Sequence, residues 1–292
     1  MPHSKNNSII KIARRFKREI LNSFKTHIVY KYKDFSIKLP ANHLLPYYQQ
    51  TCPKYDRFLP HLAKYVGASD SIVDIGANVG DSLAGMVEKN ANSNYICIEP
   101  DDSFYKYLEE NIERIKKSII DVKIKAIKAL VGKNISNVSL DGKGGTKHAV
   151  TDNLGRIMSL PLDEIIPNCL VRILKSDVDG FDYDVLDASE LVIQKHKPII
   201  FFECQYDFVY QKNGYLETIK KLELAGYCDW TIFDNFGEVV VRTNDIDILS
   251  QLMSYVWQQN VGKTTRTIYY FDILCVQKKD SSLIDKVLSE YN

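Results

Sequence analysis

Apolar runs of strand length alternate with amphipathic segments of helix length along most of the chain. The segments between the runs repeat apolar residues at helical spacing. We expect strands at 71–76, 94–100, 121–132, 171–180 and 197–203, and helices at 81–90, 101–117, 182–194 and 214–224. Apolar strands that alternate with helices predict an α/β fold with a doubly wound, mostly parallel sheet. The functional crevice of such a sheet lies at the carboxyl ends of its strands.

The two ends of the chain carry other patterns. By their spacing, residues 8–25 form an amphipathic helix, residues 28–38 an edge strand or hairpin, and residues 55–66 a short helix after a loop rich in Pro and Tyr. After the last of the core helices, the apolar runs suit late strands, some of them antiparallel. We therefore divide the chain into a substrate-side extension, residues 1–50, and a main domain, residues 51–292.

Charge is unevenly distributed over the 292 residues. The formal net charge is +1, which gives the whole molecule no electrostatic reason to bind nucleic acid. Residues 1–25 hold seven basic side chains and one acidic one, a net charge of +6, so the remainder carries −5. A basic face opposite an apolar stripe, as in residues 8–25, is typical of helices that contact an anionic membrane. Alternatively, the stripe packs against the sheet or against a second subunit, as in a homodimer.

The cysteines and the apolar runs bear on location. No two of the six cysteines form a C-x-x-C pair, and buried thiols in a reducing compartment are the simplest interpretation. The N-terminus lacks the apolar stretch of a secretory signal, and no apolar run reaches the roughly 20 residues of a membrane span. We expect a cytoplasmic protein that residues 8–25 could attach to the inner face of the membrane.

The strongest local motif is VDIGANVGD, residues 73–81, where the first core strand turns into a helix. Gly76 and Gly80 allow a tight turn and a close approach to a ligand. About 20 residues further on, the second strand ends at Glu99, where a carboxylate can accept hydrogen bonds from both hydroxyls of a ribose. The glycines alone would also suit a structural turn that binds nothing, but the acid in this register favours a ligand that contains ribose.

Acidic side chains distinguish between two such ligands. The dinucleotide motif G-x-G-x-x-G places a pyrophosphate at the helix N-terminus. Here Asn78 and Asp81 occupy the second and third glycine positions, and Asp74 lies beside them. Carboxylates repel a pyrophosphate and attract a cation, so the motif favours S-adenosylmethionine, which has a sulfonium and an ammonium but no phosphate. The predicted cofactor-binding set is completed by Ala77, Pro100 and Leu130.

Together these segments resemble the FkbM family of class I methyltransferases. The resemblance runs from about residue 55 to residue 210 and rests on VDIGANVGD (73–81), IEPD (98–101), SLPLDEII (159–166), LKSDVDGFDYDVL (174–186) and KPIIFFE (197–203). It implies a Rossmann-like fold: a seven-stranded, mostly parallel sheet, helices on both faces and an N-terminal helical extension. It also implies an S-adenosylmethionine-dependent O-methyltransferase that acts on sugars or polyketide-type compounds. Where the family usually has Glu, this chain has Asp179 and Asp182.

Acids gather at the predicted ends of the fourth and fifth strands. In a class I sheet the methyl group lies near the end of the fourth strand, here Lys175, Asp177 and Asp179, which share one side if the strand persists. Glu203 ends the neighbouring strand. These four residues are the candidate catalytic set. Three roles fit: a general base for a hydroxyl acceptor, a Mg²⁺ site of Asp177, Asp179 and Glu203, or a structural network with Lys175.

The acceptor side has candidates of its own. The polar, Gly-rich stretch 141–147 is expected to form an exposed loop over the crevice, with His148 beside it as a further base. Tyr47, Tyr48 and the loop are expected to line the acceptor site, because tyrosines offer apolar faces and hydroxyls to sugar rings. A glycan on a lipid carrier would suit both this site and a helix at the membrane.

Two other classes of function fit parts of the sequence. Asp177-Val178-Asp179 is a D-x-D triplet, which holds a metal and a nucleotide sugar in many glycosyltransferases, but it leaves the motif at 73–81 without a role. A methyltransferase-like scaffold without activity is compatible with Asp at positions 179 and 182. The presence of Asp74, Asn78, Glu99, Lys175 and Asp177 argues against a loss of activity.

Overall fold

The structure is a computed structural model that describes residues 27–133, 135–136, 138–141, 148–151, 157–261 and 267–292. The predicted helix at residues 8–25 and most of the predicted loop at 141–147 lie outside the described residues. Within the described part of the chain, no helix is both long and apolar enough to cross a membrane.

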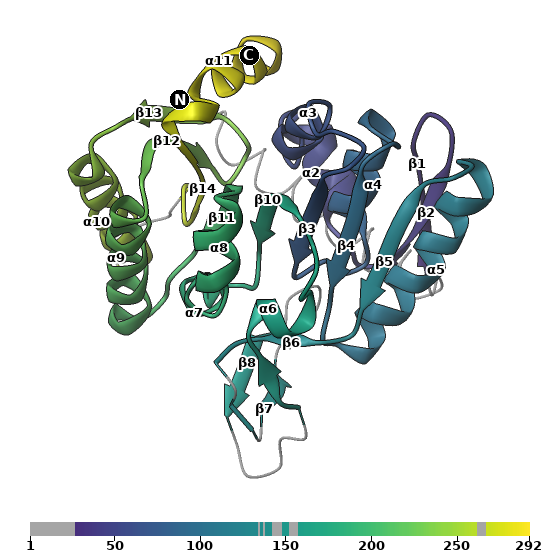
Figure 1. The fold of residues 1–292 in the computed structure, drawn as a ribbon, viewed down its shortest axis with the longest axis horizontal. Helices are drawn as coiled ribbons and strands as arrows, with labels where there is room; N and C mark the ends of the chain where they lie inside the picture. Colours follow the sequence, from purple (N-terminus) through teal and green to yellow (C-terminus); the bar gives the residue numbers. More distant parts are fainter. Residues whose placement is uncertain (1–26, 134, 137, 142–147, 152–156, 262–266) are drawn as a thin grey trace, which may run out of the picture.

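The core is a twisted sheet that, in the described part of the chain, has eight strands (Figure 1). Their order is β13-β12-β14-β11-β10-β3-β4-β5. The bounds are β3 Ser71–Ile75, β4 Asn94–Ile98, β5 Lys123–Ile127, β10 Val171–Ser176, β11 Ile199–Cys204, β12 Tyr227–Asp234, β13 Val239–Thr243 and β14 Phe271–Gln277. The prediction of a mostly parallel sheet is confirmed, with one strand more than the seven expected, because β13 pairs antiparallel with the edge strand β12.

The directions of the strands show which edge of the sheet carries the crevice. Strands β5, β4, β3, β10 and β11 run parallel, and β14 lies antiparallel between β11 and β12. The chain crosses from β3 to β4 on one side and returns to β10 on the other. This reversal of strand order opens a crevice at the carboxyl ends of β3 and β10.

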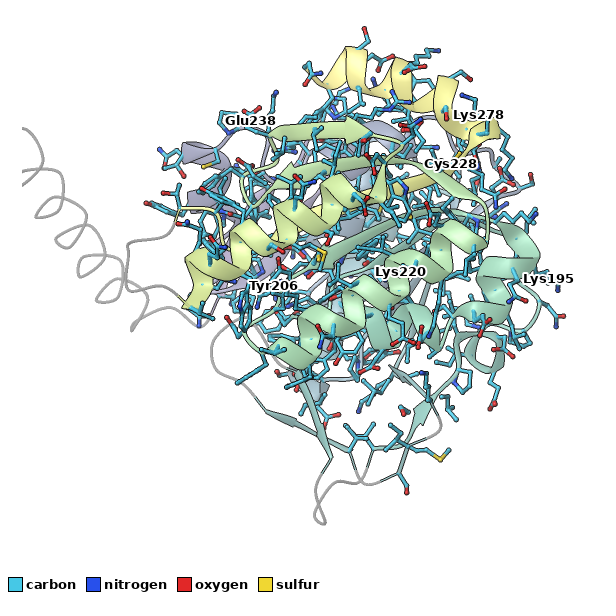
Figure 2. The ribbon with its side chains drawn as sticks, turned by 90° about the vertical axis from the view of Figure 1, so that its left-hand side faces the viewer. Lys195, Tyr206, Lys220, Cys228, Glu238 and Lys278 are labelled. Carbon is cyan, nitrogen blue, oxygen red and sulfur yellow. The ribbon has the colours of Figure 1, made fainter. Side chains whose placement is uncertain are left out.

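Helices cover both faces of the sheet because its strand residues are apolar on both sides. One face carries α3 Phe58–Ala63, α4 Asp81–Lys89, α5 Asp102–Ser118 and α11 Ser281–Tyr291. The other carries α6 Leu162–Ile165, α7 Asp182–Asp187, α8 Glu190–His196, α9 Val209–Leu224 and α10 Ile246–Val261. Figure 2 shows α9, which carries Lys220, beside α10 on this second face. Neither α10 nor α11 was predicted.

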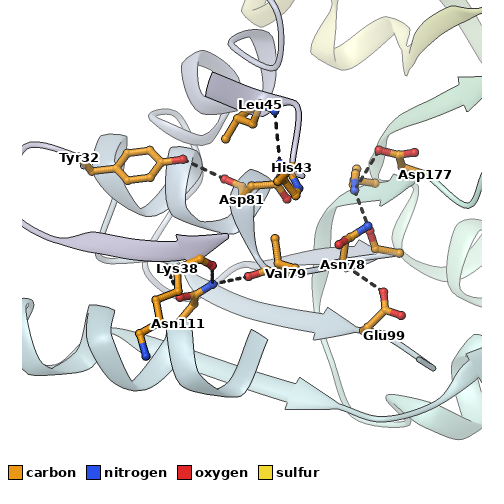
Figure 3. Close-up of polar contacts among 12 residues, drawn as sticks. Tyr32, Lys38, His43, Leu45, Asn78, Val79, Asp81, Glu99, Asn111 and Asp177 are labelled. Atoms are coloured by element: carbon orange, nitrogen blue, oxygen red, sulfur yellow. Dashed lines mark hydrogen bonds and ion pairs between the residues drawn. The ribbon is translucent and has the colours of Figure 1, made fainter. Parts of the chain in front are cut away.

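The N-terminal segment forms a cap on the first face. β1 His27–Lys31 and β2 Ser36–Pro40 pair as an antiparallel hairpin, as one of the two sequence interpretations predicted, and form a sheet of their own. Asn111 of α5 holds the hairpin: its side chain accepts a hydrogen bond from Lys38 N–H at 2.7 Å and donates to Val79 O at 2.8 Å (Figure 3). The same asparagine therefore fixes both the hairpin and the turn after β3.

Two predicted elements are wrong in detail. The loop rich in Pro and Tyr is in fact a helix, α2 Leu45–Thr51, whose proline lies in the first turn, where a helix tolerates it. The single helix expected at 182–194 is two helices, α7 and α8. It breaks after Ala188 because that carbonyl accepts a hydrogen bond from Leu162 N–H at 3.0 Å instead of continuing the helix.

Two small sheets lie below the main sheet in the view of Figure 1. β6 Leu130–Val131 pairs with β9 Ser159–Leu160, and β7 Val138–Asp141 pairs with β8 His148–Thr151. The strand predicted at 121–132 is therefore divided: its first half belongs to the main sheet and its last residues to this outlying sheet. The division brings Leu130 beneath the ends of β3 and β4.

Candidate active site

The turn between β3 and α4 packs directly against the end of β10. Gly76, Asn78 and Gly80 have φ values of 74°, 49° and 84°, in the left-handed region that glycine adopts freely and asparagine tolerates. A Cβ atom at Gly76 would lie 2.0 Å from the backbone oxygen of Asp177. Glycine is therefore required at position 76 by backbone shape and by the neighbouring strand.

Glu99 closes the second strand of the site, as the motif predicted. Its side chain is buried and accepts a hydrogen bond from Asn78 N–H at 2.8 Å (Figure 3). Its other carboxylate oxygen accepts a hydrogen bond from Asp101 N–H at 2.9 Å. Burial raises the pKa of Glu99 to about 7, against the lowering effect of these two bonds. Each oxygen keeps a further acceptor position, so the carboxylate can still bind a pair of hydroxyls.

A mainly apolar cavity opens between the turn, Glu99 and the small sheets. Among the predicted site residues it is lined by Gly76, Asn78, Glu99, Pro100, Leu130, Asp177 and Asp179. The predicted residues outside its lining are Asp74, Ala77, Gly80, Asp81, Lys175 and Glu203. Lining residues that the sequence did not single out include Phe104, Lys133, Phe181 and Asp184. The sequence gives no local signal that these four side chains face the cavity, because that depends on how their segments pack in the folded protein.

Asp74 and Lys175 form a buried ion pair behind the cavity. Their side chains are 1% and 4% exposed, and Lys175 Nζ lies 2.8 Å from Asp74 Oδ1. The same ammonium donates to Gly76 O at 3.2 Å and lies 3.5 Å from Asp177 Oδ2. Burial alone would lower the pKa of Lys175, but Asp74 and Asp177 raise it well above its ordinary value. Lys175 is therefore a fixed cation that joins the glycine turn to Asp177.

The strand that carries Asp177 ends earlier than predicted. β10 stops at Ser176, and Asp179 and Gly180 follow with φ values of 54° and 93°. Asp177 and Asp179 therefore project from a turn and not from one side of a continuing strand. The Asp182 side chain holds this turn by accepting hydrogen bonds from Ser176 Oγ at 2.6 Å and Val178 N–H at 3.2 Å.

Acidic side chains continue across the sheet from Asp177. Ser176 is paired with Phe202, so Asp177 lies level with Glu203, and Glu203 is paired with Asp272 of β14. Burial, and then the charge of Asp177, raises the pKa of both Glu203 and Asp272 well above the ordinary range. Sequence reasoning missed Asp272. The signal available was one acid inside the apolar run FDILCV.

The acceptor-side residues stay predictions, whereas the metal prediction is not supported. Tyr47 and Tyr48 lie on α2, and the ring of Tyr48 packs 4.8 Å from that of Tyr55. His148 begins β8, at the border of the undescribed loop. Among the described residues, no three His, Cys, Asp or Glu side chains converge as ligands for a metal ion, so the Mg²⁺ site predicted at Asp177, Asp179 and Glu203 is not supported.

Solved structures share parts of this fold at low sequence identity. A methyltransferase FkbM from Methylobacillus flagellatus is 18% identical over 62% of this chain, with a TM-score of 0.41, and this chain covers 52% of it, about half its length. A precorrin-6y C5,15-methyltransferase from Geobacter metallireducens is 9% identical, with 76% and 86% of the two chains covered and a TM-score of 0.40. For TYW2 of M. jannaschii in complex with AdoMet the identity is 11%, the coverage 86% and 85%, and the TM-score 0.42.

Sequence comparison gives the family. No curated protein matches this chain. The family model described as the methyltransferase FkbM domain matches residues 74–228, which is more than half of the 292 residues. That segment runs from Asp74 in the first core strand to the start of β12 and includes Glu99 and Asp177. With a parallel sheet whose order reverses at β3 and an antiparallel β14 inserted before β12, the fold is the Rossmann-like fold of class I methyltransferases. The chain belongs to the FkbM methyltransferase family.

Proposed function

We propose that this protein transfers the methyl group of S-adenosylmethionine to a hydroxyl group of a sugar or glycan. The observation that carries the proposal is the cavity, which has the buried carboxylate of Glu99 at one part of its wall and the exposed carboxylate of Asp177 at another. The wall between them is mainly apolar, as a nucleoside base requires.

Residues of this chain fit the distinct parts of the cofactor. Glu99 would hold the ribose hydroxyls through its remaining acceptor positions. Asp179 would face its ammonium group, Asp177 would lie nearer to the sulfonium, and the apolar side chains of Ile98 and Leu130 would contact its base. When bound, the cofactor supplies an electrophilic methyl group.

Asp177 is the proposed general base. It is the predicted catalytic acid that both lines the cavity and has a largely open side chain, 47% exposed. Lys175, 3.5 Å away, orients this carboxylate without neutralising it fully, because the lysine also pairs with Asp74 at 2.8 Å. As the oxygen–methyl bond forms and the methyl–sulfur bond breaks, the hydroxyl proton passes to Asp177.

A labelling experiment tests the proposal. Purified protein is mixed with methyl-labelled S-adenosylmethionine and a glycan extract of the source cell, and the products are hydrolysed and analysed by mass spectrometry. We expect labelled O-methyl sugars, and none when Asp177→Asn replaces the native protein. Binding of the demethylated cofactor without transfer to any glycan hydroxyl, or transfer to nitrogen only, would contradict it.

A further inference from the structure

The acceptor side of the site is more acidic than methyl transfer requires. We infer that Glu203, Asp272 and Asp56 bind a positively charged group of the acceptor, such as the ammonium of an amino sugar, beside the hydroxyl that is methylated. This inference rests on the proposed function and adds the charge class of its substrate.

Strand register places three of the carboxylates in one row. Side chains alternate between the two faces along a strand, so Glu203 shares a face with Phe201, and Asp272 with Leu274, both in the core under α3 and α11. Glu203 and Asp272 are directly paired across antiparallel strands, and Asp177 lies level with them at the end of β10. Like charges placed directly opposite are destabilising, so this row favours bound protons or a compensating cation.

The segment just before α3, which packs over this face of the sheet, adds Asp56 to these acids. Asp56 lies just before α3 and lines a narrow recess with Asp272. Desolvation, and then the charges of Asp81 and Asp177, raise the pKa of Asp56 to about 8. Tyr55 and Tyr270 lie beside the same acids, and Asp56 and burial raise the pKa of the Tyr55 hydroxyl. The row and the layer above it therefore enclose one acidic region.

Glu203 has a buried carboxyl oxygen that no described group of the protein contacts by a hydrogen bond. The residue is 7% exposed, and its Oε2 atom has no hydrogen-bond partner among the described residues. A buried carboxyl oxygen without a partner is destabilising in general, and such an atom is one of the places where a bound ion or polar ligand group would be stabilised.

The nearby cations do not neutralise the region. In the described part of the chain these are Lys175, Arg57 and Lys54, of which Lys54 lines the same recess but pairs with Glu238 at 2.8 Å; His43 lies 3.6 Å from Asp81. The carboxyl groups are Asp56, Asp74, Asp81, Asp177, Glu203 and Asp272. Carboxyls therefore outnumber cations here, and the raised pKa values of Asp56, Glu203 and Asp272 mean that protons compensate the excess while no cation is bound. Lys175 is already engaged by Asp74 at 2.8 Å, and Arg57 donates to Gln49 Oε1 at 2.7 Å.

Neither the cofactor nor a metal ion accounts for this charge. Asp177 lines the cofactor cavity, but Glu203, Asp272 and Asp56 do not. The described acids also do not converge on one point as metal ligands do. An ammonium group fits better, because it offers three donors to separate carboxylates.

The test compares two oligosaccharides that differ only in charge. A glucosamine tetramer and its fully N-acetylated counterpart are titrated into the protein at saturating S-adenosylhomocysteine, by calorimetry at pH 7. We expect the glucosamine tetramer to bind at least about tenfold more tightly than the acetylated one, since a buried charge pair contributes that much or more. Glu203→Gln and Asp272→Asn should each abolish most of this difference. Glu223→Gln, which removes an exposed acid on α9, should leave it unchanged.

The outcomes separate this inference from the proposed function. Equal affinities for the two tetramers, or a preference that both variants retain, would overturn the inference. So would binding of Mg²⁺ that Glu203→Gln abolishes in a protein without preference for the amine. Affinity for S-adenosylhomocysteine, measured in parallel, reports folding of the variants. If the native protein does not bind it, the proposed function itself fails.

Discussion

At the scale of single residues, Glu99 is the side chain on which cofactor binding depends most. It is buried, and in the proposed function its charged form would accept hydrogen bonds from the ribose hydroxyls. Glu99→Gln should weaken binding of S-adenosylhomocysteine by about 1.5–3 kcal/mol. Because the pKa of Glu99 is raised to about 7, affinity should also fall as the pH drops from 8 to 6 in the native protein. Calorimetry at both pH values checks this, and a Glu99→Gln variant with the same pH dependence would contradict it.

Asp177 is predicted to affect turnover and not cofactor affinity. A positioned base contributes about 10²–10⁴-fold to rate. Asp177→Asn should reduce turnover of a labelled acceptor by that factor while the dissociation constant of S-adenosylhomocysteine changes less than about threefold. The variant should remain folded, because the side chain is 47% exposed. Full activity in the variant would show that another group accepts the proton.

At the scale of elements, the turn between β10 and α7 depends on a residue that sequence reasoning treated only as a departure from the family pattern. Asp182 is fully buried and accepts hydrogen bonds from Ser176, Val178 and Tyr215. Asp182→Ala should lower the free energy of unfolding by about 2–4 kcal/mol, since it leaves these donors unpaired. Urea denaturation measures this, with Glu223→Gln as the surface control. An unchanged midpoint would mean that the turn is held by other contacts.

Sequence patterns predicted the parallel half of the sheet better than the rest. The strands at 71–76 and 94–100 are continuous apolar runs that end at Gly76 and Glu99, so both the elements and the cofactor candidates could be located. The end of β10 could not, because Asp179 adopts a left-handed conformation that its residue type does not require. Asp56 and Asp272 join the site only through long-range packing and antiparallel pairing, for which a single sequence gives no local signal.

At the scale of the whole molecule, buried acids should make the ligand-free protein more stable at lower pH. Folding raises the pKa of Glu99 and of Asp182 to about 7, above their unfolded values, so the folded state binds more protons than the unfolded state between about pH 4.5 and pH 7. Stability is therefore lost as the pH rises through 7. Lowering the pH from 8 to 6 should add about 2–3 kcal/mol from these two groups. A lower melting temperature at pH 6 than at pH 8 would contradict this.

We also propose, from the sequence alone, that residues 8–25 bind an anionic membrane surface. The net charge of +6 in residues 1–25 corresponds to roughly 1 kcal/mol per basic residue near such a surface before screening. The full chain should co-sediment with anionic vesicles but not with neutral ones, and a chain that begins at residue 26 should not sediment with either. Equal sedimentation of both chains, with a loss of stability in the shorter one, would assign the helix to the core or to a second subunit.

The reversed direction of β14 has a consequence for how this enzyme family can change. A parallel strand delivers its last residue to the active edge, whereas β14 delivers its first, so the segment leading into it, with Tyr270 and Asp272, becomes a wall of the acceptor region. That segment and Asp56 both lie outside residues 74–228, which the family model matches. The proposed acceptor region therefore draws residues from both sides of the segment that defines the family, whereas the residues proposed to hold the methyl donor lie inside it.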